Sequence, residues 1–243
     1  MAAGIGLVGF GIMGTSMAPA LLEAGHRLTV FDADAAALDR AGEMGCEIAG
    51  SAAAVAAAGE LHLISLPRPE HVTSAVQGPD GLLGTATAGR GIVDTSTVAP
   101  EPTRGTAAAA AAQGVGYLDA PVLGRPRGVG RWTLPVGGDE AELRRAAPVL
   151  RTVASKIIHV GPAGRGNAVK LLNNLMFGAI NAATCEMFAV SDQVGLDRRL
   201  LYDTIVDSGA ATVSNLFREL GPKIIEGDYE PLFSVDNLEK DIG

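Results

Sequence analysis

A glycine-rich segment near the amino terminus has the spacing of a dinucleotide-binding loop. It reads G-x-G-x-x-G and consists of Gly9, Phe10, Gly11, Ile12, Met13 and Gly14. In this pattern the first glycine permits a tight turn, the second lets the backbone approach a pyrophosphate, and the third lets a helix pack on a strand. Free N–H groups at the start of the following helix bind the phosphates. An ordinary strand-to-helix turn is the structural alternative.

An acidic residue stands where such a loop needs one. Asp32 follows Gly14 by 18 residues (32 − 14), close to the spacing of about 20 at which an acid accepts hydrogen bonds from the adenosine ribose. A 2′-phosphate would be repelled by this carboxylate and by that of Asp34, and no arginine directly follows Asp32. These charges predict NAD as the cofactor, with NADP disfavoured.

A lysine and two amides share one stripe of an apolar helical pattern. Asn174 and Asn181 follow Lys170 by four and eleven residues, which places all three within roughly 40° of one another on a helix. The functional interpretation is a lysine at a domain cleft, where burial and a positive nicotinamide ring favour a proton donor that works near neutral pH. Asn174 would fix its orientation. The alternative is a lysine whose stem covers apolar surface while its ammonium reaches water.

Strand and helix patterns alternate over the first two thirds of the chain. Strands are predicted at residues 4–9, 27–31, 61–66, 91–94, 115–119, 133–136 and 157–160. Helices are predicted at residues 13–24, 35–45, 51–59 and 100–113, with Ser51 as an N-cap. This alternation predicts an α/β fold with a Rossmann-type, doubly wound parallel sheet.

The pattern changes after Gly161-Pro162-Ala163-Gly164. Beyond this segment helices are predicted at residues 168–195, 197–208 and 212–220, and no strand is predicted. We therefore expect two domains, a dinucleotide-binding domain at residues 1–162 and a smaller all-helical domain at residues 163–243. The long apolar helix predicts a homodimer or homotetramer in which the helical domains make the contact.

Composition excludes several classes of protein. The chain is 47% hydrophobic and 19% charged, enough apolar material for a packed core rather than a disordered protein. A net charge of −8 argues against nucleic-acid binding. No basic segment precedes the apolar amino terminus, and the uncharged run at residues 171–185 is too short to span a bilayer. Cys46 and Cys185 lack metal-ligand spacing. We expect a cytoplasmic protein without a metal or a membrane contact.

Several motifs, in order along the chain, resemble the β-hydroxyacid dehydrogenase family, which includes 3-hydroxyisobutyrate dehydrogenase and tartronate semialdehyde reductase. They are residues 9–22, Leu66-Pro67, residues 93–100, 119–126 and 133–138, Lys170 with Asn174, and Glu239-Lys240-Asp241. The resemblance covers essentially the whole chain and is far more specific than the glycine pattern alone.

The resemblance implies an NAD-dependent oxidoreductase that interconverts a small β-hydroxy acid and its semialdehyde or keto form. It implies that Lys170 and Asn174 are the catalytic lysine and its companion amide, and that both touch the substrate. The resemblance adds Leu66, Pro67, Thr97 and Lys240 to the cofactor site. It assigns to the substrate site Ser96, Leu123, Gly124 and Arg125.

The chain departs from the family pattern in three places. Family members usually carry Ser-Gly-Gly where this chain has Leu123-Gly124-Arg125. Arg125 either replaces the lost contacts with a bidentate grip on a carboxylate or is a surface or structural arginine, and the sequence leaves both open. Trp132 stands where the family commonly has glycine, and we expect it to narrow the pocket. Family members also usually continue with more helix after the Lys-Asp dipeptide, whereas this sequence stops at Gly243, and the sequence leaves open whether the helical domain is truncated there.

Two other functions remain open. One is an imine reductase on the same architecture, which the retained Lys170 disfavours. The other is a non-catalytic dinucleotide-binding or scaffold protein, which the altered Ser-Gly-Gly segment favours and Lys170, Asn174 and Lys240 disfavour. The sequence does not identify the substrate.

Overall fold

The structure is a computed structural model that describes residues 3–85, 88–210, 212–231 and 233–242. The chain divides into two compact units, Met1–Lys170 and Leu171–Gly243. Gly243, the last residue of the sequence, lies outside the described residues. The domain boundary that we placed at residue 162 stays a prediction. The division between the two compact units falls eight residues later, after Lys170, inside a helix.

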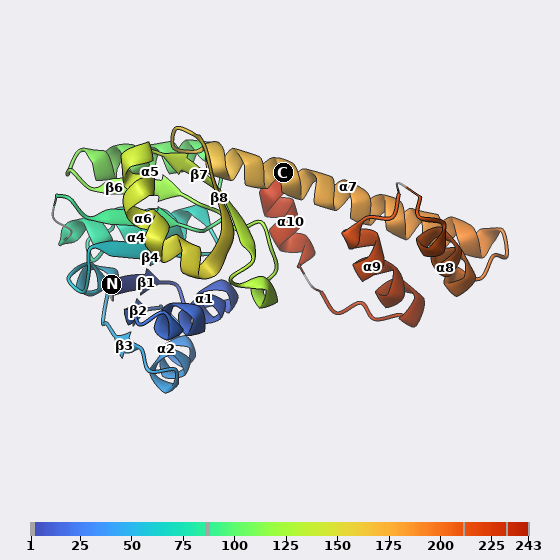
Figure 1. The fold of residues 1–243 in the computed structure, drawn as a ribbon, viewed down its shortest axis with the longest axis horizontal. Coiled ribbons are helices and arrows are strands. Elements are labelled where there is room, and N and C mark those ends of the chain that lie inside the picture. The colour runs from blue at the N-terminus through green and yellow to red at the C-terminus, as the bar shows by residue number, and fades with distance from the viewer. Residues whose placement is uncertain (1–2, 86–87, 211, 232, 243) are drawn as a thin grey trace. The chain divides into compact units, whose positions relative to one another are not determined.

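The first unit contains a sheet of eight strands (Figure 1). They are β1 (Gly4–Val8), β2 (Arg27–Phe31), β3 (Glu47–Ile48), β4 (Leu61–Ile64), β5 (Gly91–Asp94), β6 (Gly116–Asp119), β7 (Trp132–Gly138) and β8 (Ala154–Gly161). Their order in the sheet is β3-β2-β1-β4-β5-β6-β7-β8. All neighbouring pairs are parallel except β6 and β7. The doubly wound α/β class predicted from the sequence is confirmed.

Two features of the sheet differ from the prediction. Strand β3 was not predicted because its two residues, both exposed, form no hydrophobic run. Strand β7 is antiparallel to β6, so the sheet is mixed rather than parallel throughout. A parallel neighbour needs a crossover connection of a dozen or more residues, usually a helix. The segment between β6 and β7 contains only the short 3₁₀ helix η2 (Pro126–Gly128).

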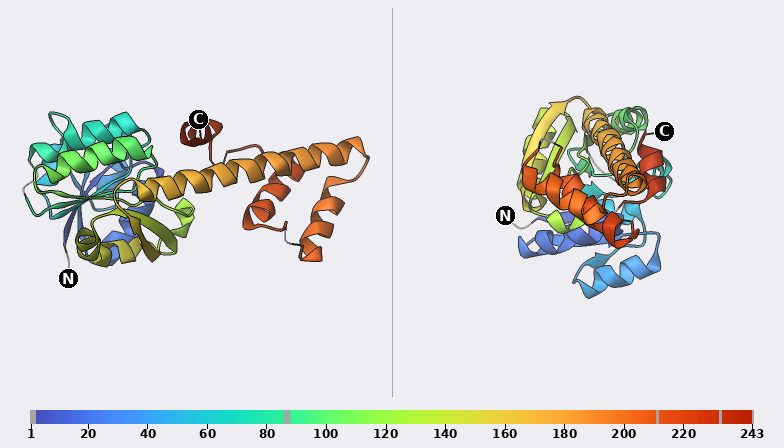
Figure 2. Two further views of the ribbon diagram at one scale, coloured as in Figure 1. Left: turned by 90° about the horizontal axis from the view of Figure 1, so that it is seen from above. Right: turned by 90° about the vertical axis from the view of Figure 1, so that its right-hand side faces the viewer.

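Helices cover both faces of this sheet. They are α1 (Ile12–Glu23), α2 (Ala35–Glu43), α3 (Ala52–Ala56), α4 (Pro69–Gln77), α5 (Pro100–Ala111) and α6 (Glu140–Val153), with a 3₁₀ turn η1 (Leu82–Gly84). Helices α1, α2 and α6 supply residues to one hydrophobic cluster, and α3, α4 and α5 to the other. The left view of Figure 2 shows α4 and α5 on one side of the sheet and α1 and α6 on the other. Helices α4 and α6 were not predicted from the sequence.

Alternation along the strands produces the two clusters. Leu7 and Val8 are adjacent in β1 and almost completely buried, yet they belong to different clusters. The same holds for Leu63 and Ile64 in β4. Successive side chains of a strand point to opposite faces, so a buried strand with helices on both sides is apolar throughout.

The second unit is helical. Its elements are the larger part of α7 (Arg165–Gln193), then α8 (Arg198–Ser208), α9 (Asn215–Glu226) and α10 (Val235–Ile242). Figure 1 shows α8 and α9 beside the carboxyl-terminal half of α7. Stacked rings connect these helices, with centroids 6.4 Å apart for Phe188 and Phe217 and 5.4 Å apart for Tyr202 and Phe217. None of the described helices is long and apolar enough to cross a membrane. Helix α10 was not predicted as an element.

A histidine lies in the centre of the first unit's sheet. His62, in β4, is fully buried, and neither ring nitrogen has a hydrogen-bond partner among the described residues. Burial, and to a lesser extent the charge of Arg90, lowers its pKa to about 4. The folded state therefore holds this ring neutral over a pH range in which the unfolded chain protonates it.

This burial predicts a specific loss of stability in acid. The unfolded chain binds a proton at His62 below about pH 6.5, whereas the folded state does so only below about pH 4, so stability falls as the pH drops between these values. The wild type loses unfolding free energy when the pH is lowered from 7 to 4.5, and we expect His62→Leu to reduce that loss by roughly 2–3 kcal/mol. Urea titrations at both pH values measure it. The exposed His71 supplies the control, His71→Leu. Equal acid sensitivity in both variants would contradict the prediction.

Candidate active site

The predicted glycine loop joins β1 to α1 at the carboxyl end of the sheet. Gly9 has a φ of +94°, and a Cβ added there would lie 2.2 Å from the carbonyl oxygen of Ser65. A Cβ on Gly14 would lie 2.2 Å from the carbonyl oxygen of Gly9. A Cβ on Gly11, by contrast, would meet nothing within 4 Å. The first and third glycines are therefore required by the fold, and the second faces open space.

The open space at Gly11 fits a pyrophosphate. Gly11 is the N-cap of α1 and offers no capping side chain, and the first turn contains no acidic residue. Ile12, which follows it, is 75% exposed. Uncapped N–H groups at a helix start attract anions. The loop also stands where the strand order reverses, between β1 and β4, which is the usual ligand position in such sheets. These residues fit a dinucleotide cofactor.

Asp32 follows β2 and is hydrogen-bonded to the glycine loop. One carboxylate oxygen accepts the N–H of Phe10 at 2.5 Å and the other accepts the N–H of Asp34 at 2.9 Å. Each oxygen retains a second acceptor site for a ribose hydroxyl. Asp34 caps α2 by accepting the N–H of Ala36 at 3.1 Å, and a nitrogen of Arg40 lies 4.0 Å from its carboxylate. Arg40 was not part of the prediction from the sequence, and it partly offsets the charge of Asp34.

The segments after β4 and β5 meet through a serine hydroxyl. Ser96, 3% exposed, accepts the N–H of Leu66 at 2.9 Å. Its own N–H donates to Asp94 at 2.8 Å, and the hydroxyl of Tyr117 donates to the other oxygen of Asp94 at 2.7 Å. Burial raises the pKa of Asp94, and these donors counteract the rise. The structure thus brings together the predicted segments Leu66-Pro67 and Ser96-Thr97.

A second buried carboxylate holds the start of α7. Asp119, at the end of β6, accepts the N–H groups of Gly164 and Asn167, both at 2.8 Å. The side-chain amide of Asn167 accepts the N–H of Val98 at 3.2 Å and donates to the hydroxyl of Thr103 at 3.1 Å. Burial raises the pKa of Asp119, and the charge of Asp94 adds to the rise. No role was predicted for Asp119 or Asn167 from the sequence.

Lys170 lies in the second turn of α7, because the helix begins at Arg165 rather than near residue 168 as predicted. Its side chain is half-buried, and Nζ donates to the carbonyl oxygen of Val122 at 2.8 Å. Val122 directly precedes the predicted substrate segment. Within the first unit, Lys170 therefore lies beside the backbone that carries Leu123, Gly124 and Arg125.

The structure corrects the expectation for Trp132. The indole is 1% exposed and belongs to the hydrophobic core, so it does not line a pocket. Its Nε1 instead donates to the carbonyl oxygen of Arg125 at 2.7 Å. Leu123 pairs with Thr133 through two backbone hydrogen bonds of 2.9 and 3.2 Å. The segment of residues 123–125 is thus fastened to the beginning of β7.

In the second unit, Asn174 and Lys240 gather around one carboxylate. The amide of Asn174 donates to Asp241 at 2.6 Å, and Nζ of Lys240 lies 3.1 Å from the other oxygen of Asp241. Asn174 and Asp241 are 5% and 7% exposed. Asp241 was missing from the predicted site, although the Lys-Asp dipeptide was a visible signal.

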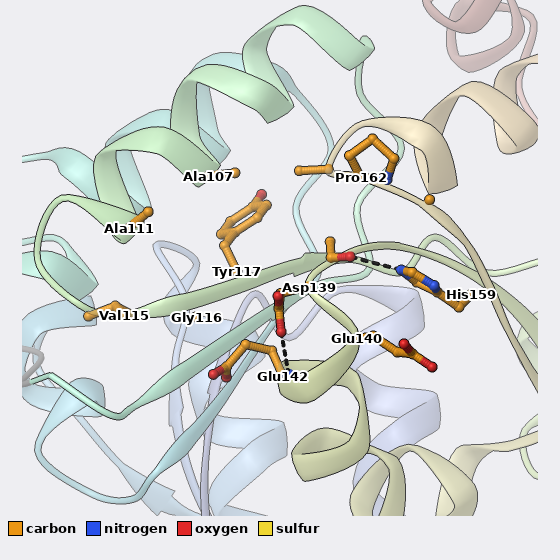
Figure 3. Close-up of a pocket in the computed structure, with 13 residues that line it drawn as sticks. Ala107, Ala111, Val115, Gly116, Tyr117, Asp139, Glu140, Glu142, His159 and Pro162 are labelled. Carbon is orange, nitrogen blue, oxygen red and sulfur yellow. Dashed lines mark hydrogen bonds between the residues drawn. The ribbon is translucent and has the colours of Figure 1, made fainter.

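Two hollows of the surface lie away from these residues. One, of about 580 Å³, opens between α5 and the ends of β7 and β8 (Figure 3). Its lining includes Tyr117, and His159, whose ring nitrogen lies 2.8 Å from the carbonyl oxygen of Gly138. None of the predicted site residues lines it. Among the described residues, no group of three or more His, Cys, Asp or Glu is placed to hold a metal ion. The candidate site is therefore defined by the strand ends and their loops.

Comparison with known proteins is consistent with this geometry. Residues 4–161 match the model of the NAD-binding domain of 6-phosphogluconate dehydrogenase, and residues 164–243 match that of the NAD-binding region of NADP-dependent 3-hydroxyisobutyrate dehydrogenase. The chain is 37% identical to 3-hydroxyisobutyrate dehydrogenase of Pseudomonas aeruginosa, over 98% of this chain and 83% of that protein. It is 36% identical to 2-(hydroxymethyl)glutarate dehydrogenase of Eubacterium barkeri, over 98% of this chain and 80% of that protein.

A solved structure shows the same architecture. The 3-hydroxyisobutyrate dehydrogenase of Mycobacterium tuberculosis, determined with L-serine, superposes with a TM-score of 0.88 at 32% identity, over 99% of this chain and 84% of that chain. The resemblance noted in the sequence is therefore confirmed along the whole length. The chain belongs to the β-hydroxyacid dehydrogenase family of NAD(P)-dependent oxidoreductases.

Proposed function

We propose that this oxidoreductase interconverts a small β-hydroxy acid and its semialdehyde or keto form, with Lys170 as the general acid and base. The observation that carries the proposal is the hydrogen bond from Lys170 Nζ to the carbonyl oxygen of Val122. It places an ammonium group next to the segment that departs from the family's substrate pattern. A lysine ammonium has three donors, so a bond to Val122 is compatible with a second bond to a substrate oxygen.

Each part of the site has a separate task in this proposal. The glycine loop and Asp32 bind and orient the dinucleotide, whose nicotinamide ring supplies or accepts the hydride. Lys170 gives a proton to the substrate's carbonyl oxygen during reduction and takes it back during oxidation. Correct orientation of the reacting carbon against the ring supplies much of the rate. For Asn174 and Lys240, which lie around Asp241 in the second unit, we keep the roles that the family resemblance implies, a companion amide and a cofactor contact.

The departures from the family pattern bear on the substrate. Leu123 removes the hydroxyl that a serine would offer, and Arg125 brings a guanidinium suited to a carboxylate. We propose that Arg125 recognises the acid group. A cytoplasmic location is part of the proposal, supported by Cys46 and Cys185, which are both free thiols.

The first test is the activity of Lys170 variants. NADH oxidation with a panel of small aldehydes that carry a carboxylate should show turnover, whereas cyclic imines should show none. Lys170→Ala should lower kcat by roughly 10²–10⁴, the usual contribution of a positioned proton donor. Lys170→Arg should restore little, since a guanidinium does not give up its proton. The dissociation constant of NADH should stay unchanged, because the glycine loop is a separate element.

Two results would count against the proposal. Full activity in Lys170→Ala would remove the lysine from the mechanism. Turnover of cyclic imines in preference to the aldehydes would favour an imine reductase, and cofactor binding without any turnover would favour a scaffold.

Cofactor choice is tested by the acidic residues after β2. We expect NADH to bind more tightly than NADPH, because the Asp32 carboxylate repels a 2′-phosphate. Asp32→Ser should narrow the difference, and Asp34→Asn should narrow it less, since asparagine keeps the α2 cap and removes only the outer charge. Fluorescence titrations of both cofactors measure the two dissociation constants. NADPH binding at equal or greater strength in the wild type would refute the preference.

We also propose a homodimer or homotetramer. Large apolar side chains of α7 and the turn after it are strongly exposed, with 65% exposure at Leu172, 65% at Met176 and 71% at Val194. An exposed apolar surface of this kind commonly binds a second copy of the chain.

Light scattering at micromolar concentration should show a dimer or larger assembly. The double variant Leu172→Glu/Met176→Glu should shift it toward the monomer, because the contact would bury unpaired charge. Met44→Glu, at another exposed apolar residue, is the control. A wild type that stays monomeric would refute the proposal.

A further inference from the structure

The sole tryptophan of the chain lies directly beneath the segment that departs from the family pattern. Trp132 is the first residue of β7, and its side chain is enclosed by the hydrophobic cluster that also contains Leu134 and Val136. An indole is the largest side chain a core can hold, and its one N–H needs a partner when buried. The structure supplies that partner from the loop above rather than from the core.

The partner is the main chain of Arg125. Its carbonyl oxygen accepts Nε1–H of Trp132 at 2.7 Å and also the N–H of Gly128 at 2.8 Å. Because both donors converge on one oxygen, the position of this peptide group is fixed by the indole and by the η2 turn together. An apolar residue of similar size at position 132 would fill the core but would remove one of these two donors.

Gly124 fits the indole closely. A Cβ added at Gly124 would lie 2.4 Å from Cδ1 of Trp132 and 3.2 Å from its Nε1. The space that any side chain at position 124 would need is therefore occupied by the indole. Trp132 and Gly124 form a complementary pair, and together they hold the backbone of the segment against β7.

The other end of the same segment accepts a hydrogen bond from the proposed catalytic lysine of α7. Val122 accepts the hydrogen bond from Lys170, and Leu123 pairs with Thr133 on both of its backbone groups. Between the carbonyl that binds Lys170 and the carbonyl that binds Trp132 there are only two intervening residues, Leu123 and Gly124. The indole thus fixes the place of Arg125 relative to the Lys170 ammonium.

Charge indicates what this segment recognises. Arg125, Arg127 and Arg131 stand within seven residues of a chain whose net charge is −8. Arg127 and Arg131 are exposed. A local concentration of guanidinium groups in an otherwise acidic protein favours an anion, and the planar fork of arginine suits a carboxylate.

We propose that Trp132 is a positioning residue for substrate specificity, which through the Arg125 carbonyl places the Leu123–Arg125 segment for a substrate carboxylate at a set distance from Lys170. The proposal rests on the proposed function for the role of Lys170. In the usual Ser-Gly-Gly pattern a hydroxyl and backbone N–H groups serve the carboxylate, whereas here the buried Trp132 supports the segment that carries Arg125.

Binding of a non-reducible acid tests the proposal without turnover. Malonate is titrated by calorimetry into the protein saturated with NAD⁺, and malonamide is the uncharged comparison. Trp132→Phe keeps most of the ring volume but removes the N–H, so its malonate dissociation constant should rise about three- to tenfold, the value of one hydrogen bond. The preference for malonate, given by the ratio of the malonamide to the malonate dissociation constant, should become smaller in this variant. The dissociation constant of NAD⁺ should not change.

A matched variant separates positioning from packing. Leu134→Val removes buried volume from the same strand and the same cluster, and it keeps the hydrogen bonds that Trp132 and Thr133 make with residues 123–125. It should lower the melting temperature and leave malonate binding at the wild-type value. Gly124→Ala perturbs the same contact from the exposed residue of the pair, and it leaves no cavity in the core. It should weaken malonate binding as Trp132→Phe does.

Since Trp132 is the single tryptophan, its emission also reports on the loop directly. Malonate should change the emission of the wild-type NAD⁺ complex, and malonamide should not. The proposal is overturned if Trp132→Phe and Gly124→Ala bind malonate as the wild type does, if Leu134→Val weakens binding equally, or if the wild type does not bind malonate. Failure of the proposed function gives a different result, namely no turnover with any aldehyde while these binding differences remain.

Discussion

A carboxylate buried at the end of β6 is the interaction on which the arrangement of the first unit depends. Asp119 is fully enclosed, a position that disfavours its charge, yet both of its oxygens accept backbone N–H groups from the start of α7. Those N–H groups belong to a helix amino terminus, where the partial positive charge also stabilises a carboxylate. The helix that carries Lys170 is thereby joined to the strand that leads into residues 122–125. Replacing the carboxylate would leave two buried N–H groups without an acceptor, which costs more than the bonds themselves contribute.

The glycine loop obeys a separate constraint. The backbone of neighbouring residues lies so close to Gly9 and Gly14 that neither position has room for a side chain. The geometry of these two glycines is therefore fixed before any cofactor binds. Asp32 adds a carboxylate that binds the Phe10 N–H and thus joins the end of β2 to the loop after β1. The glycine loop, proposed to bind the cofactor, and Lys170, proposed to transfer the proton, therefore depend on different contacts of the first unit. No hydrogen bond of Lys170 or Asp32 given above joins one of these parts to the other, so the two proposed roles are separable by substitution.

Local sequence patterns predicted the parts of the fold that depend on local physics. Glycines with a required positive φ, buried apolar strands and the Ser51 cap, which accepts the N–H of Ala54 at 3.1 Å, were all visible in the sequence. The two-residue β3 carries no pattern of its own and exists through pairing with β2. Helix α6 was missed although Asp139 caps it by accepting two N–H groups. The direction of β7 follows from a connection without a crossover helix, a signal that was present in the sequence but not used.

The site was predicted as a set of segments, and what the sequence did not contain was their pairing in space. Asp119 and Asn167 are 48 residues apart, and Asn174 and Asp241 are 67 apart, so no spacing rule links them.

The departures at positions 123–125 and 132 illustrate the difference most clearly. Taken one by one, a leucine for a serine, an arginine for a glycine and a tryptophan for a glycine look like unrelated losses. In the structure the indole occupies the space beside Gly124 and binds the carbonyl of Arg125, so the substitutions are parts of one arrangement. A side chain at position 124 would exclude the tryptophan, and without the tryptophan the Arg125 carbonyl would lose a donor. The altered segment therefore has a defined structural support of its own, which agrees with the proposal that it recognises the substrate.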